Sequence, residues 1–136
     1  MKKITTTLVA TILFIVSHAQ TVTYKVTLAK TLVYNDNYEE WIAVDSTYPS
    51  EMYAFFENKK IKITDEAHSD YIVYGDPELK KKPTYVTSKW KAIDEKQRDC
   101  IIMLQIINPE DKKYKTNILY VMYKSFTFFY VLEPTE

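Results

Sequence analysis

The chain has 136 residues, 46% of them apolar or aromatic, which is enough for one globular domain but short for two. Eighteen Lys and Arg balance eighteen Asp and Glu, so no net field attracts nucleic acid or an anionic membrane. The only glycine is Gly75, which excludes sites built on glycine-rich loops, such as a P-loop, a dinucleotide-binding turn or a nucleophile elbow.

Residues 1–19 have the pattern of a secretory signal peptide. Two lysines begin it, an uncharged and mostly apolar run covers residues 8–16, and Ser17 and Ala19 suit the −3 and −1 positions of a cleavage site. A membrane anchor is the competing interpretation, but a span needs about 20 apolar residues and this run is shorter. We therefore expect cleavage after Ala19, a single domain over residues 20–136, and a periplasmic or secreted protein without a stable membrane anchor. The peptide resembles those of Gram-negative bacteria.

Alternation of apolar and polar residues predicts a strand at the start of the mature chain. Its apolar face consists of the even-numbered residues Val22, Tyr24, Val26, Leu28, Leu32 and Tyr34. Asn and Asp at residues 35–37 predict a turn, because both tolerate positive φ and bond their own backbone. A second strand is expected over residues 40–44.

The middle of the chain predicts a hairpin with arms at residues 52–56 and 60–64. Ser50 can cap a helix, so a short helix is the alternative for the first arm. After a return strand at residues 71–74, the stretch 75–83 holds Gly75 and two prolines, and it is expected to be the longest loop.

Four strands are expected in the second half of the chain, at residues 85–93, 100–107, 117–123 and 126–132. Residues 100–107 are apolar on both faces apart from Gln105, which predicts a central strand covered on both sides. About eight or nine short strands, mostly in a meander, predict an all-β, single-domain antiparallel sandwich or flattened barrel. The scarcity of glycine favours these shapes over a tightly curved barrel.

Few residues of the mature chain offer catalytic chemistry. His68 is its only histidine and lies in an acidic turn at residues 65–70, where a hydrolase or a metal-dependent enzyme would have to use it. A zinc site usually draws several Cys or His ligands, so we interpret this segment as a polar turn. Cys100 is the single cysteine and opens an apolar run, so we expect a buried, inert thiol.

Aromatic residues are the unusual feature of the composition. The chain contains twelve Tyr, two Trp and six Phe. Tyrosine suits both half-buried strands and binding faces, so these side chains belong either to the core or to a surface for a partner. The candidates for a binding face lie near strand ends or loops: Tyr34, Tyr38, Trp41, Tyr48 and Tyr53.

The sequence therefore predicts an exported, non-catalytic binding or interaction module. Its partner is expected to be a protein, a peptide or a glycan and not nucleic acid, and we expect no catalytic residue, cofactor or metal ligand. Two alternatives remain open: a small hydrolase or metal-dependent enzyme using His68, and a structural or assembly component of the cell envelope.

The cleavage site can be tested directly. We expect the protein recovered from its host to begin at Gln20, because the small residues at Ser17 and Ala19 fit the peptidase pockets. Intact mass spectrometry measures this. Full-length chain starting at Met1 in the membrane fraction would contradict the prediction.

Overall fold

Nine β-strands form one antiparallel sheet in the computed structural model, which describes residues 21–64, 69–111 and 113–135. The strands are β1 (Val22–Asn35), β2 (Glu40–Thr47), β3 (Tyr53–Glu57), β4 (Lys60–Thr64), β5 (Ser69–Lys81), β6 (Tyr85–Asp94), β7 (Asp99–Ile107), β8 (Thr116–Met122) and β9 (Phe126–Pro134). No helix within these ranges has the length and apolar character that a membrane span requires.

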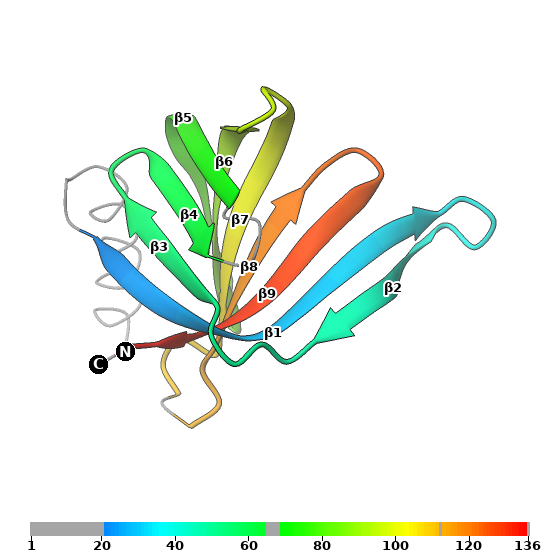
Figure 1. Cartoon of the computed structure of the whole chain (residues 1–136). Coiled ribbons are helices and arrows are strands. Elements are labelled where there is room, and N and C mark those ends of the chain that lie inside the picture. The colour runs from blue at the N-terminus through cyan, green and yellow to red at the C-terminus, as the bar shows by residue number, and fades with distance from the viewer. Residues whose placement is uncertain (1–20, 65–68, 112, 136) are drawn as a thin grey trace.

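The sheet closes into a barrel (Figure 1). Strands β3 to β9 follow one another as a meander, and β1 joins the two ends by pairing with β3 on one side and β9 on the other. β2 pairs with the second half of β1 and is the ninth strand, outside the barrel. The predicted all-β antiparallel fold is confirmed, and of its two predicted forms the chain adopts the barrel.

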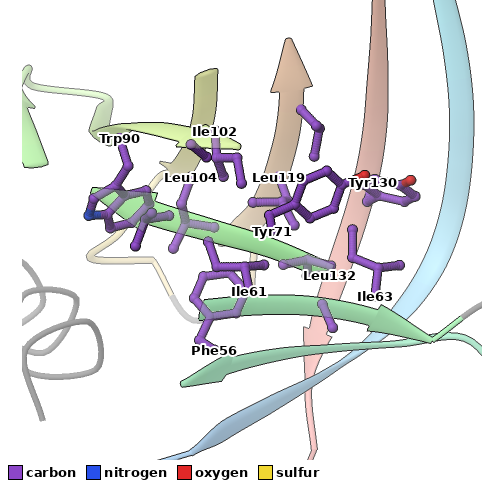
Figure 2. Packing of buried hydrophobic residues seen from close by; sticks show 14 of the residues in the cluster. Phe56, Ile61, Ile63, Tyr71, Trp90, Ile102, Leu104, Leu119, Tyr130 and Leu132 are labelled. Carbon is purple, nitrogen blue, oxygen red and sulfur yellow. The ribbon is translucent and has the colours of Figure 1, made fainter. Parts of the chain in front are cut away.

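The core fills the inside of the barrel with one face of each barrel strand (Figure 2). Trp90 is the largest of the fully buried side chains, at 1% exposure. The other members of the core cluster come from strands far apart in the sequence and include Phe56, Ile61, Ile63, Ile102, Leu104, Leu119 and Leu132. Burying one large apolar side chain contributes about 1.5–3 kcal/mol, so this cluster supplies the main stabilisation of a chain without a disulfide.

A β-bulge in β1 changes which residues face the core. The register with β9 shifts between Val26 and Leu28, so Val26 is fully buried and Ala29, not Leu28, packs against the core. The prediction that the even-numbered face continues to Tyr34 is therefore wrong. An extra residue in one strand reverses the inward face of everything that follows it.

The predicted loop at residues 75–83 is also wrong for most of its length, since β5 extends to Lys81. The register between β5 and β6 breaks between Tyr74 and Glu78, and Gly75 within this break has a φ of 75°. Gly75 and Pro77 thus accommodate a bulge in a long strand, where a positive φ is needed and a missing N–H is tolerated.

Two further expectations concern β7 and β3. β7 is covered on one face only: Cys100, Ile102, Leu104 and Ile106 are buried, whereas Ile101 is exposed. The prediction of a doubly covered strand is wrong because a single closed barrel has only one interior.

Residues 53–57 form strand β3, as predicted for the hairpin, and not the alternative helix.

Replacement of Cys100 by Ala should lower the free energy of unfolding by about 1 kcal/mol, because the side chain is buried on the inner face of β7. Burial raises the pKa of this thiol to about 11, so the native protein should react with a thiol reagent far more slowly than the unfolded chain. Denaturant titration and timed labelling with mass detection measure the two effects. Equal labelling rates in the two states would show that the thiol is accessible.

Candidate functional site

The second half of β1 pairs with β2 on one edge and, as far as Val33, with β9 on the other, so β2 and the turn before it extend the sheet beyond the closed barrel (Figure 1). We call residues 29–47 the β1–β2 ribbon. Its turn is built by Asn35, whose side-chain oxygen accepts hydrogen bonds from the backbone N–H groups of Asn37 (2.9 Å) and Tyr38 (3.2 Å). Glu39 then takes a φ of 51° to enter β2. The Asn-rich segment thus forms the turn that its composition predicts.

Four of the five candidate aromatics lie on or beside this ribbon. Tyr34 and Trp41 are paired across the two strands, their ring centroids 5.5 Å apart in an edge-to-face arrangement, and they are 37% and 43% exposed. Tyr38 and Tyr48 lie just before and just after β2, and both are strongly exposed. Tyr53 is half-buried on β3 beside Phe55 and does not belong to this group.

Aliphatic side chains are also exposed on these two strands, Val33 and Ile42 on the face opposite the Tyr34–Trp41 pair, and the sequence did not single them out. Val33 and Val44 are exposed, and Ile42, paired with Val33, is half-buried. The register between β1 and β2 shifts after Thr31, so Val44 has no partner residue on β1. The strand predicted at residues 40–44 is confirmed within β2, which contributes no buried residue.

One edge of β2 is free. Among the described residues β2 pairs only with β1, so alternate backbone N–H and C=O groups of its other edge have no strand beside them. Residues 31–51 contain five acidic residues and no Lys or Arg. Two of these acids, Glu40 and Asp45, lie on β2 itself. The free edge is therefore both unpaired and negatively charged.

The ribbon is attached to the barrel at the turn between β8 and β9. The backbone N–H of Tyr34 donates to the carbonyl of Ser125 at 3.1 Å, and Phe126 lies opposite Val33 in the register. The ring of Phe126 stacks on Tyr123, with centroids 4.5 Å apart and planes 19° from parallel. Tyr123 therefore packs beside the point where β1 continues past the end of its ladder with β9.

Tyr123 is held by a buried carboxylate at the end of β6. Asp94 is 8% exposed, and its Oδ2 accepts hydrogen bonds from the Tyr123 hydroxyl (2.8 Å) and from Nε of Arg98 (2.7 Å). Its Oδ1 accepts from the backbone N–H groups of Lys96 and Arg98, both at 2.9 Å. The Arg98 guanidinium also lies over the Tyr123 ring, 5.0 Å from its centroid. We call Asp94, Arg98 and Tyr123 the Asp94 cluster.

The protonation states of this cluster are fixed around neutral pH. Burial opposes ionisation of Asp94, but the hydrogen bonds from Arg98, Tyr123 and Lys96 outweigh it and lower its pKa to about 2. Burial and the bond to Asp94 raise the pKa of the Tyr123 hydroxyl, which therefore keeps its proton. Neither group exchanges a proton near pH 7, so the cluster positions the chain and is not suited to acid–base chemistry.

A shallow depression of about 210 Å³ lies beside the Asp94 cluster. Two of the acids along it have partners within the protein: Asp70 pairs with Lys60 at 3.5 Å, and Glu95 accepts a hydrogen bond from the Asp70 backbone N–H. In the described part of the chain no three His, Cys, Asp or Glu side chains are grouped in a way that could hold a metal ion. Residues 65–68 of the predicted acidic turn, His68 among them, lie outside the described residues, and its last two residues, Ser69 and Asp70, begin β5.

Searches of protein-family models, of curated proteins and of solved structures find no match to this chain.

Replacing Asp94 by Asn should lower the free energy of unfolding by on the order of 1 kcal/mol at pH 7, because the charged acceptor of four hydrogen bonds is lost. Because the pKa of Asp94 is lower in the folded protein than in the unfolded chain, its ionised carboxylate stabilises the fold above about pH 4. This contribution to the free energy of unfolding disappears as the pH falls towards 2 and the carboxylate is protonated. Wild-type stability should therefore drop between pH 4 and 2, and the drop should be smaller in Asp94→Asn. Urea titrations across this range measure it.

A matched change at the exposed Asp76 of β5 serves as the control, and Asp76→Asn should keep the wild-type pH dependence. An acid-induced loss of stability as steep in Asp94→Asn as in the wild type would contradict the role of the Asp94 cluster.

Proposed function

We propose that this protein is an exported, non-catalytic binding module that contacts its partner through the β1–β2 ribbon. The observation that carries the proposal is the exposed Tyr34–Trp41 pair, which lies on a strand pair that extends beyond the barrel. Export is proposed on the signal-peptide pattern of residues 1–19.

Stability does not explain the apolar residues of β2. The barrel closes through β1, β3 and β9, and β2 adds no buried side chain to the core. An exposed strand without a packing role is expected to be polar. Trp41, Ile42 and Val44 depart from this expectation, and on one face of the sheet Trp41 forms an exposed aromatic pair with Tyr34, the kind of apolar surface that marks interaction sites.

The residue types favour a protein or peptide partner over a glycan. Trp and Tyr provide large contact areas and are enriched among the residues that dominate binding energy. Here the aromatic pair is accompanied by the branched aliphatic residues Val33 and Val44 and by a free strand edge. Aliphatic side chains and backbone groups are used to bind polypeptides, whereas sugar rings are held mainly by aromatic faces and polar side chains.

Removing the aromatic pair by Tyr34→Ala with Trp41→Ala should reduce partner capture from envelope extract at least about tenfold, as expected for residues of the interaction centre. The melting temperature should change by only a few degrees, because both side chains lie outside the core. Immobilised protein and quantitative mass spectrometry measure the capture.

Tyr114→Ala is the matched control, since Tyr114 is an exposed tyrosine in the connection between β7 and β8. This variant should capture the same proteins as the wild type. The fluorescence of Trp41 gives a second readout, because Trp90, the other tryptophan of the described residues, is buried and unaffected by surface contacts. Equal capture by all three proteins would contradict the proposed site.

A further inference from the structure

We infer that the free edge of β2 binds an extended segment of a partner protein by β-strand addition, and that this segment carries Lys or Arg beside apolar residues. The inference rests on the proposed function and specifies how the β1–β2 ribbon recognises its partner. Three features of the ribbon support it: an open backbone edge, an acidic charge without counter-ions, and poor suitability for pairing with a second copy.

The edge of β2 is long and accessible. β2 has eight residues, and seven of them are exposed, so no side chain of another element covers the strand. An incoming strand can satisfy the unpaired backbone groups along this length, and main-chain hydrogen bonds then provide affinity while alternate side chains provide selectivity. Trp41 and Val44 lie along the same strand and can contact the apolar side chains of the added segment.

The negative charge of the ribbon favours positively charged residues in the partner segment that pairs with β2. Glu40 and Asp45 lie near the two ends of β2, and Asp36 and Glu39 lie in the adjoining turn. Within the described residues, no ion pair joins any of these carboxylates to a Lys or Arg. Opposite charges across paired strands are stabilising and like charges are destabilising, so a segment with Lys or Arg is favoured.

A second copy of this chain fits the edge poorly. Two β2 strands side by side would bring together four carboxylates, from Glu40 and Asp45 of each copy, and no cation. The lysines of β5 also lie on a strand with a partly free edge, but Pro77 and the register break after Tyr74 interrupt it. The remaining run from Glu78 to Lys81 is too short for a matched ladder with β2.

The probe is a synthetic eight-residue peptide in which Lys alternates with Val, compared with an acidic version in which Glu replaces Lys. A third peptide keeps the Lys sequence but carries N-methyl groups on alternate backbone nitrogens, which removes the donors of one edge. The Lys peptide should bind, should shift the emission of Trp41, and should slow hydrogen exchange of the amides in residues 40–47. The acidic and the N-methylated peptides should bind at least about tenfold more weakly.

Charge reversal tests the protein side. Glu40→Lys with Asp45→Lys should weaken binding of the Lys peptide about tenfold or more, because two attractions become repulsions. The matched control reverses two exposed acids elsewhere, Asp76→Lys with Glu133→Lys, and should retain most of the wild-type affinity at the same net charge. Circular dichroism verifies that both variants keep the strand signal.

The outcomes separate the inference from the proposed function. Equal binding of the N-methylated peptide, or no protection of residues 40–47, overturns strand addition, and equal binding of the acidic peptide overturns the charge selection. If the protein alone forms larger assemblies as its concentration rises, the inference that β2 binds a partner protein and not a second copy of the chain is overturned. In each of these cases the proposed function stands if capture from envelope extract still depends on Tyr34 and Trp41, and it fails if capture does not.

Discussion

The pairing of β1 with β9 is the constraint on which the rest of the structure depends. β1 has fourteen residues and contacts three strands: β3 along its beginning, β9 along most of its length and β2 along its end. This pairing completes the barrel without β2, so the side chains of β2 are not needed to fill the core. The same long strand therefore supports both a core that needs no disulfide and a surface whose residues are free to serve another purpose.

Local pattern predicted most of the strands, because alternation is imposed by the pleat of each strand and needs no distant information. The bulges after Val26 and after Tyr74 could not be predicted in this way, since an extra residue becomes visible only against a partner strand. Barrel closure is also non-local, and it decided that β7 has one buried face. The segment around His68 remains outside what the structure describes.

For the candidate site, too, the sequence predicted the local features and missed those that depend on contacts between distant residues. Exposure of Tyr34, Tyr38, Trp41 and Tyr48 follows from their places near strand ends, whereas the contact between Tyr34 and Trp41 depends on a register set by the turn. Asp94 was missed because it looks like one acid of a solvated turn, and its partner Tyr123 is distant in the sequence. Tyr123 links this carboxylate to Phe126, which lies opposite Val33 where β1 continues past β9.

The two ends of the described domain meet, and this determines how the protein can be attached to anything else. Thr135 donates hydrogen bonds from its backbone N–H and its hydroxyl to the carbonyl of Thr23, so the start of β1 and the end of β9 lie side by side. The turn of the ribbon lies at the far end of β1, up to about 45 Å away at the rise of an extended strand. A tag, a linker or a support joined at either end therefore lies well away from that turn, and both ends present the molecule in the same orientation.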